Sequence, residues 1–284
     1  MAQPFVTRFA PSPTGLLHRG HAFSALTAHR AALEAGGRFL LRIEDIDATR
    51  SRPAFEAAIL EDLAWLGLTW ETPVRRQSDH MADYRQALDR LAGQGLTYRC
   101  FRTRREVAEE IGRAPHGAMD VFRGTPLPAD EEARRLAAGE PHAWRLSLDA
   151  AHRRLGGFHH LTFTEEGHGP EGETGLIQAR PELGGDVVLA RKDVGVAYHL
   201  AVVVDDALQG VSHVIRGQDL FAAAHVQRLL QALLDLSTPT YRHHPLLAGP
   251  DGKRYAKRDR AENLGDIRGR GVTAQALRRE LGFD

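Results

Sequence analysis

Two histidines at the start of an expected helix are the first residues in the sequence that could do chemistry. The segment RFAPSPTGLLHRGH (8–21) places His18 and His21 on either side of Gly20, after the strand-like run FVTRF. A helix that follows such a turn directs its first backbone N–H groups and its positive dipole end toward a bound anion. Gly20 lets a flat base or ribose approach the backbone. The segment predicts a nucleotide site, although an isolated turn of this kind is as often structural.

A second candidate for phosphate chemistry lies near the other end of the chain. Lys257 belongs to the basic loop RYAKR (254–258), which follows the last strand-like segment. Nucleotidyl transfer needs a cation that can follow negative charge onto the departing pyrophosphate, and a lysine on a loop meets that need. Taken by itself, a basic loop is more often a solvated surface.

The apolar periodicity places both segments on an α/β fold. FVTRF is followed by a helix from Gly20 to the glycines at 36–37 and then by the buried strand RFLLRI (38–43). This order begins a parallel, Rossmann-like sheet. Further helices are expected from Pro53 to Gly67, from the cap Ser78 to Leu91, and from Asp219 to Leu236. Further parallel strands are expected over 186–190, 201–206 and 211–217.

The composition is that of an ordinary globular protein. Lys+Arg and Asp+Glu both total 37, so the net charge neither favours nor excludes a nucleic-acid partner. No apolar run approaches the roughly 20 residues that span a bilayer, and the first residues lack the features of a signal peptide. The single cysteine, Cys100, excludes an internal disulfide and indicates a reducing compartment. We therefore expect a cytoplasmic protein with no membrane partner.

Five blocks, taken in order, resemble the catalytic core of the glutamyl-type class I aminoacyl-tRNA synthetases. They are RFAPSPTGLLHRGH, LLRIEDIDATRSRP, EDLAWLGLTWE, AYHLAVVVDDALQGVSHVIRGQDL and RYAKR. HRGH stands at the family's HIGH-type signature and RYAKR at its KMSKS-type loop. The resemblance covers residues 4–100 and 175–260. It implies that ATP is a substrate accompanied by Mg²⁺, that His18, Gly20 and His21 bind the nucleotide, and that Lys257 acts on the pyrophosphate.

The same resemblance implies a pocket for L-glutamate. Glutamate carries two carboxylates and an ammonium group, so its pocket should hold arginines and an acid. Arg8, Tyr198 and Arg216 match the family's positions, and Glu44 would take the ammonium group. The rest of the expected set lies next to Arg8: Phe9, Ala10, Pro11 and Ser12. Singly, each residue also has a structural reading, as a sheet-edge charge, a cap or a core ring. Asp45 and Asp47 are expected to be structural or capping acids.

The resemblance also divides the chain. It implies a first catalytic half over 1–100, a connective insertion over 101–174, a second half over 175–236, and a KMSKS-type loop with a short helical tail over 237–284. Since only residues 259–284 follow the loop, we expect no anticodon-binding domain.

This length resembles the family's truncated branch, whose members activate glutamate without tRNA and transfer it to queuosine in the anticodon loop of tRNA(Asp). The expected partners are queuosine-bearing tRNA(Asp), L-glutamate and ATP, and the expected state is a monomer. Two alternatives stay open: a glutamate ligase with another acceptor, and a catalytically idle module that binds tRNA or protein.

Two features depart from the family's pattern. The family often has Cys-x-Cys and, about twenty residues on, Tyr-x₃-Cys, which supply four ligands for zinc. The corresponding residues here are Cys100, Arg102, Phe122 and Pro126. A lone thiolate beside an arginine predicts that zinc is absent. Five scattered histidines lack ligand spacing: His116, His142, His159, His160 and His168. The second departure is Arg19, where the family usually has an apolar residue.

Overall fold

Parallel strands run through the centre of the protein. The computed structural model describes residues 4–112, 121–192, 195–247 and 262–283. The strands that pair in parallel are β1 (Val6–Phe9), β2 (Arg38–Ile43), β3 (Arg75–Arg76), β6 (Thr162–Glu165), β9 (His213–Gly217) and β10 (Thr240–His244). They form two sets, in the orders β1-β2-β3 and β6-β10-β9, and β7 (Gly175–Gln178) pairs antiparallel with β6 at the edge.

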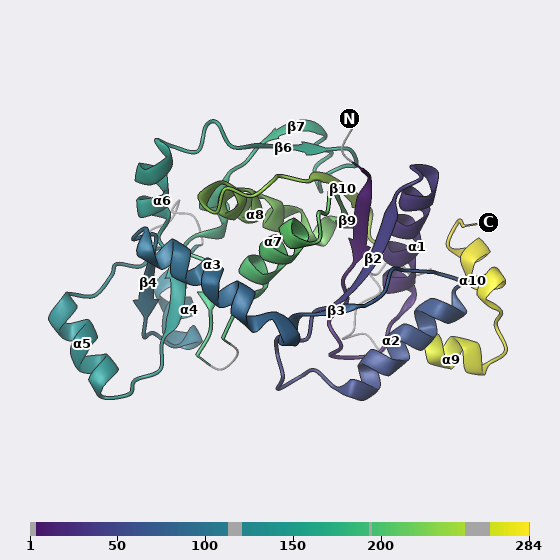
Figure 1. The fold of residues 1–284 in the computed structure, drawn as a ribbon, viewed down its shortest axis with the longest axis horizontal. Coiled ribbons are helices and arrows are strands. Elements are labelled where there is room, and N and C mark those ends of the chain that lie inside the picture. The colour runs from purple at the N-terminus through teal and green to yellow at the C-terminus, as the bar shows by residue number, and fades with distance from the viewer. Residues whose placement is uncertain (1–3, 113–120, 193–194, 248–261, 284) are drawn as a thin grey trace.

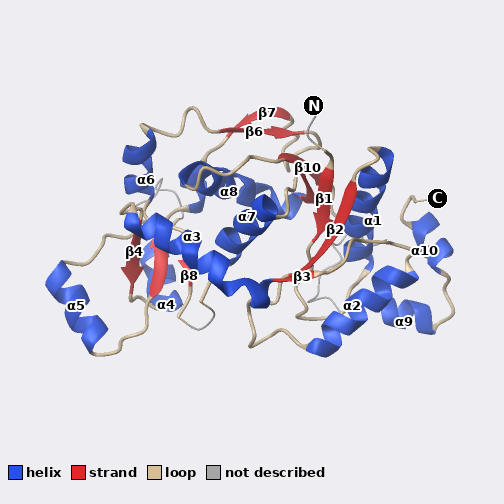
Figure 2. Cartoon of the chain, in the orientation of Figure 1, coloured by secondary structure: helices blue, strands red, loops and turns tan. Residues whose placement is uncertain are grey.

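Ser212, just before β9, links the two sets. Its backbone N–H donates to the carbonyl oxygen of Val6, 2.9 Å away, and its hydroxyl accepts from the Val6 N–H at 2.8 Å. β1 therefore lies beside β9, which gives the order β3-β2-β1-β9-β10. Figure 2 labels β3, β2, β1 and β10, and Figure 1 labels β9. This is the strand order of a Rossmann-like doubly wound sheet, so the expected fold class is confirmed.

Helices and short 3₁₀ turns connect these strands. The helices are α1 (Arg19–Glu34), α2 (Pro53–Trp65), α3 (Met81–Gly93), α4 (Arg104–Gly112), α5 (Ala129–Ala137), α6 (Leu148–Leu155), α7 (Tyr198–Leu208), α8 (Phe221–Leu233), α9 (Leu264–Gly269) and α10 (Ala274–Glu280). The 3₁₀ turns are η1 (Gln77–His80), η2 (Pro181–Gly184) and η3 (Gln218–Leu220). None of the described helices is long and apolar enough to cross a membrane.

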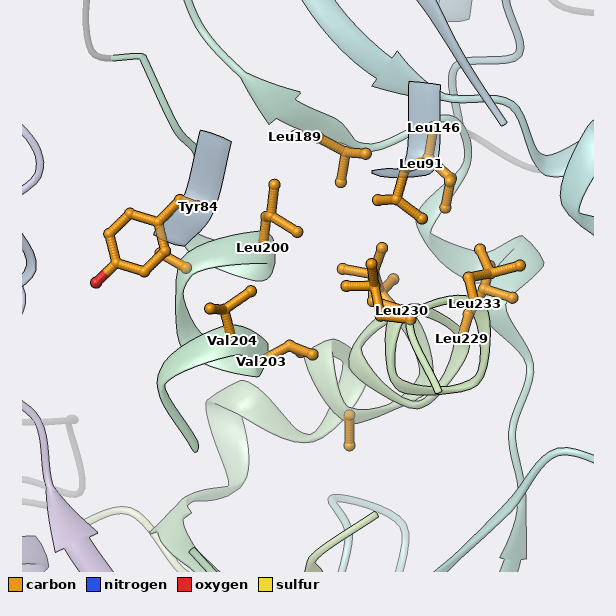
Figure 3. Close-up of a cluster of buried hydrophobic side chains, with 14 of the residues drawn as sticks. Tyr84, Leu91, Leu146, Leu189, Leu200, Val203, Val204, Leu229, Leu230 and Leu233 are labelled. Atoms are coloured by element: carbon orange, nitrogen blue, oxygen red, sulfur yellow. The ribbon is translucent and has the colours of Figure 1, made fainter. Parts of the chain in front are cut away.

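The two faces of the sheet bury two separate cores. Along β2, Leu40 joins one core while its neighbours Phe39 and Leu41 join the other, as the alternation of side chains on a strand requires. The first core is formed mainly by α3, α7, α8 and the strands beside them (Figure 3). The second lies under α1 and α2 and includes Leu264 and Leu277 of the C-terminal helices, which Figure 1 shows in yellow beside α2.

A second sheet, entirely antiparallel, lies away from the first. It consists of β4 (Thr97–Cys100), β5 (Ala143–Leu146) and β8 (Val188–Ala190). A strand over 186–190 was expected and is present as β8, but the expected parallel pairing is wrong. β8 instead pairs with β5, from within the predicted insertion. The limits 101–174 of that insertion stay a prediction, and β4 and β8 flank them.

Residues 201–206, expected as a strand, form a helix. AVVVDD belongs to α7, and every residue from Leu200 to Asp206 is buried. Periodicity cannot distinguish a buried strand from a buried helix when an apolar run is continuous, which is why the expectation was wrong.

Ser78 was expected to cap a helix, and this is also wrong. α3 begins at Met81, and the Ser78 hydroxyl donates to Asp45 at 2.6 Å. Because Asp45 also accepts from the Ser78 backbone N–H at the start of η1, this acid caps the 3₁₀ turn. Its expected role as a structural or capping acid is thereby confirmed.

Candidate active site

The HRGH turn forms the N-terminus of α1 and is built by its own histidines. His18 is the N-cap residue, and its Nδ1 accepts the backbone N–H of Gly20 at 3.1 Å. In return, the Nδ1 of His21 accepts the backbone N–H of His18 at 3.2 Å, and the two ring centres lie 3.8 Å apart. Because both Nδ1 atoms accept, each neutral ring carries its proton on Nε2. The pair is a capping box made of imidazoles.

Gly20 fits this arrangement closely. A Cβ at Gly20 would lie 3.0 Å from the ring of His18, so the capping imidazole would have to move by a few tenths of an ångström to accept a side chain there. This reason is additional to the expected approach of a base or ribose to the backbone.

Arg19 faces the C-terminal segment. Its guanidinium pairs with Glu262 at 3.1 Å and with Glu280 at 2.8 Å. Beside it, His18 forms an antiparallel bridge with Asn263, and the Leu264 N–H donates to the Leu17 carbonyl. The chain thus returns to the HRGH turn shortly after the RYAKR loop. Lys257 itself lies outside the described residues.

The expected glutamate residues meet at the carboxyl ends of neighbouring parallel strands. Arg8 belongs to β1, Glu44 follows β2, Arg216 belongs to β9, and Tyr198 is the first residue of α7. Ligands of doubly wound sheets bind at this edge.

One cavity of about 590 Å³ brings together the expected site residues that the structure describes. They are Arg8, Phe9, Ala10, Pro11, Ser12, His18, Gly20, His21, Glu44, Tyr198 and Arg216. The cavity lining also includes residues that the sequence did not single out, among them Ser24, Asp219 and His244. The roles assigned to the site residues remain predictions.

A buried acid that the sequence analysis missed holds part of this wall. Asp206 accepts from Arg8 at 3.1 Å and from Arg42 at 2.8 Å, and Arg42 reaches Glu44 at 3.2 Å. Burial opposes ionisation of Asp206, but Arg8 and Arg42 outweigh it and hold the pKa of this carboxyl below its usual value. Burial raises the pKa of Glu44, and the neighbouring arginines only partly oppose it. The acidic pair that ends VVVDD could have indicated this buried carboxylate. The sequence analysis assigned the segment to a strand and did not consider the pair.

Arg216 differs from Arg8 in the kind of partner it has. Within the described part of the chain, its hydrogen bonds go to Nε2 of His243 (3.0 Å), Oε1 of Gln227 (2.9 Å) and the Leu220 carbonyl (3.0 Å). None of these acceptors is a carboxylate, although the side chain is only 5% exposed. Burial and the nearby Arg216 cation together lower the pKa of His199 to about 4.

Most of the positions that hold zinc ligands in the family are occupied here by residues that do not bind zinc. Cys100 is buried in a small apolar cluster with Tyr98 and Phe122, and Arg102 pairs with Glu110. Arg145 lies over the Phe122 ring, 4.3 Å from its centre. These residues supply one thiol and no second zinc ligand, so they do not fit a structural zinc. The predicted absence of zinc stays a prediction.

Comparison with known proteins covers nearly the whole chain. The family model described as tRNA synthetases class I (E and Q), catalytic domain, matches residues 4–283. The chain is 47% identical to the glutamyl-Q tRNA(Asp) synthetase of Rhodobacter capsulatus, over 98% of this chain and 100% of that protein. It is 40% identical to the protein of the same name from Symbiobacterium thermophilum, over 97% and 85% of the two chains.

A solved structure agrees. The glutamate tRNA ligase of Elizabethkingia meningosepticum, in complex with its amino acid, superposes with a TM-score of 0.73 at 27% identity. The match covers 90% of this chain and 52% of that one.

Proposed function

The chain belongs to the class I tRNA synthetases for glutamate and glutamine, and from this membership we propose that it activates L-glutamate with ATP and transfers it to queuosine in tRNA(Asp). The relatives from Rhodobacter and Symbiobacterium that bear this function's name match over nearly the full length of this chain.

The charge of the cavity wall is the observation that carries the proposal. Glutamate brings two carboxylates and one ammonium group, and the wall offers Arg8, Arg216 and Glu44. Arg216 is a buried cation whose described acceptors are all uncharged. A buried cation without an anion is costly, so a carboxylate from the ligand would complete this site.

Activation requires alignment and charge stabilisation but no general base. A carboxylate oxygen of glutamate, already ionised at neutral pH, forms a bond to the α-phosphorus of ATP while the bond to pyrophosphate breaks. The Nε2–H groups of His18 and His21, at the positive end of α1, stabilise the triphosphate. Lys257 neutralises the departing pyrophosphate. Mg²⁺ accompanies ATP in this proposal, and the products are glutamyl-adenylate and pyrophosphate.

In the second step, a hydroxyl of the queuosine base attacks the glutamyl carbonyl and AMP departs. In this proposal the enzyme acts as a monomer in the cytoplasm. Activation precedes and does not require the tRNA.

Exchange of labelled pyrophosphate into ATP, without tRNA, tests the first step. We expect exchange with glutamate and none with glutamine or aspartate. If no amino acid supports exchange, the protein is instead a catalytically idle relative.

Charging of three RNAs tests the second step. Labelled glutamate should appear on queuosine-bearing tRNA(Asp), and neither on the unmodified transcript nor on tRNA(Glu). Nuclease mapping should place the label in the anticodon loop. Label at the 3′ end of tRNA(Glu) would overturn the proposed acceptor while leaving the activation step intact.

A further inference from the structure

Behind Arg216 lies a chain of buried polar groups that the proposed reaction does not use. Oε2 of Glu165, on β6, lies 2.5 Å from Nδ1 of His243, on β10. Nε2 of the same imidazole lies 3.0 Å from Nε of Arg216, on β9. The side chains of Glu165 and His243 are fully buried, and neither belongs to the lining of the cavity. Three adjacent strands thus align a carboxylate, an imidazole and a guanidinium.

The contacts determine where the imidazole proton lies. The Nε–H of Arg216 can only donate, so Nε2 of His243 must accept and the ring proton must be on Nδ1. Nδ1–H then donates to Glu165. The other carboxylate oxygen, Oε1, accepts the backbone N–H groups of Gly167 and His243, both at 2.8 Å. Every contact is therefore consistent with an ionised glutamate and a neutral histidine.

The protonation tendencies of both groups agree with this assignment. Burial is the main factor that lowers the pKa of His243, which favours the neutral ring. Burial alone would raise the pKa of Glu165, but its hydrogen bonds with His243 outweigh that effect and lower it.

We propose that Glu165 and His243 are positioning residues that hold the Arg216 guanidinium in the orientation that receives a carboxylate of glutamate. This rests on the proposed function. His243 fixes the Nε edge, while Gln227 and the Leu220 carbonyl accept from the two terminal nitrogens. Glu165 acts one step further back, because it selects the only imidazole tautomer that can accept from Arg216.

Glu165→Gln tests the proposal with almost no change in volume. The amide oxygen takes the place of Oε1, which receives two N–H groups, so the NH₂ group faces Nδ1 of His243. The imidazole must then accept at Nδ1 and carry its proton on Nε2, where it meets the N–H of Arg216. We expect the KM for glutamate in pyrophosphate exchange to rise about 5- to 30-fold, with the KM for ATP unchanged.

The adjacent acid supplies the matched control. Glu166 pairs with Arg242 on the surface, 2.7 Å away, and Glu166→Gln should leave both KM values unchanged. In ¹⁵N-histidine-labelled protein, His243 should give the Nδ1–H signature in the wild type and the Nε2–H signature in Glu165→Gln. If the role of Glu165 is purely structural, Glu165→Gln should have a lower melting temperature than the wild type, and the ratio of its two KM values should equal the wild-type ratio.

A second pair of variants covers the case in which Glu165→Gln does not fold. His243→Gln places an amide oxygen near the position of Nε2 and can still accept from Arg216, whereas His243→Leu cannot. The KM for glutamate should rise more in the leucine variant. Equal values for the two variants would overturn the proposal.

Failure of this inference can be distinguished from failure of the proposed function. If the wild type exchanges pyrophosphate with glutamate and Glu165→Gln keeps the wild-type KM, only the positioning role is refuted. If the wild type shows no exchange with glutamate, the proposed function is refuted, and the ¹⁵N signatures still decide whether Glu165 sets the tautomer.

Discussion

At the scale of single residues, His18 of the HRGH turn caps α1 with one edge of its ring, Nδ1. The function proposed above gives the opposite edge a second task, which is contact with the phosphates of ATP. A residue that both caps a helix and contacts the ligand couples the shape of the site to the stability of the helix. The sequence indicated the second task, through the spacing around Gly20, and gave no sign of the first.

Replacing His18 by asparagine separates these tasks. Asparagine is a good N-cap residue and preserves an acceptor for the Gly20 N–H, whereas alanine does not. His18→Ala should lose about 1 kcal/mol of stability, and His18→Asn close to none. Both variants should lose about 10²- to 10³-fold in exchange rate, because neither offers the Nε2–H donor. Urea unfolding and exchange at saturating ATP measure the two effects, and wild-type exchange by His18→Asn would contradict the assigned role.

At the scale of elements, local signals were read correctly where they are self-contained. β2 and α1 have their expected positions, and each follows from a pattern within its own segment. The errors arose where a distant partner decides the outcome. β8 pairs with β5, and AVVVDD is a continuous apolar run whose buried Asp206 binds arginines of β1 and β2.

Asp186 organises the antiparallel region by accepting from three donors. They are the Tyr98 hydroxyl (2.8 Å), the Gly124 N–H (2.9 Å) and the Leu148 N–H (3.0 Å). In Asp186→Asn the amide NH₂ would face one of these donors, so we expect a loss of about 2–3 kcal/mol. Asp149→Asn, at an exposed ion pair with Arg123, is the control and should change little. Equal unfolding midpoints in urea for the two variants would argue against this role.

Metal content gives the next test at this scale. Because Arg102 and Phe122 replace ligands of the family's zinc site, purified protein should contain no stoichiometric zinc. A chelator should leave its melting temperature unchanged. Elemental analysis that found one zinc per chain would contradict this prediction and would imply that other residues supply the ligands.

At the scale of the whole molecule, the C-terminal helices are part of the catalytic body. Leu264, Ile267 and Leu277 are fully buried in the core beneath α1 and α2, and Arg268 of α9 pairs with Glu61 of α2. The sequence predicted a short helical tail but could not predict where it docks, since its apolar residues specify a buried face without specifying a partner. Arg19, which departs from the family's pattern, pairs with Glu262 and Glu280 of the same C-terminal segment.

The interface between α2 and α9 predicts a pH dependence of global stability. Burial raises the pKa of Asp62 to about 6, and Arg268 opposes this only in part. Because the folded-state pKa lies above the unfolded value, ionisation destabilises the fold as pH rises from about 4 to 6. Asp62→Asn should therefore be more stable than the wild type at pH 7, by up to about 3 kcal/mol, and equal to it below pH 4. Urea unfolding across this range, with the exposed Asp89→Asn as control, measures the effect, and a constant difference at all pH values would contradict it.

The hydrogen bond from the Leu264 N–H to the Leu17 carbonyl has a consequence for synthesis of the protein. Translation produces the HRGH turn early and residues 262–283 late, so a nascent chain holds the HRGH turn while the segment that contacts it is still inside the ribosome. The strands β1 and β2 can pair long before the segment that joins His18 to Asn263 emerges. A product of premature termination would lack the partners of Leu17 and Arg19. The contacts of the HRGH turn with Glu262, Asn263 and Glu280 therefore form only after the segment over 262–283 has been made.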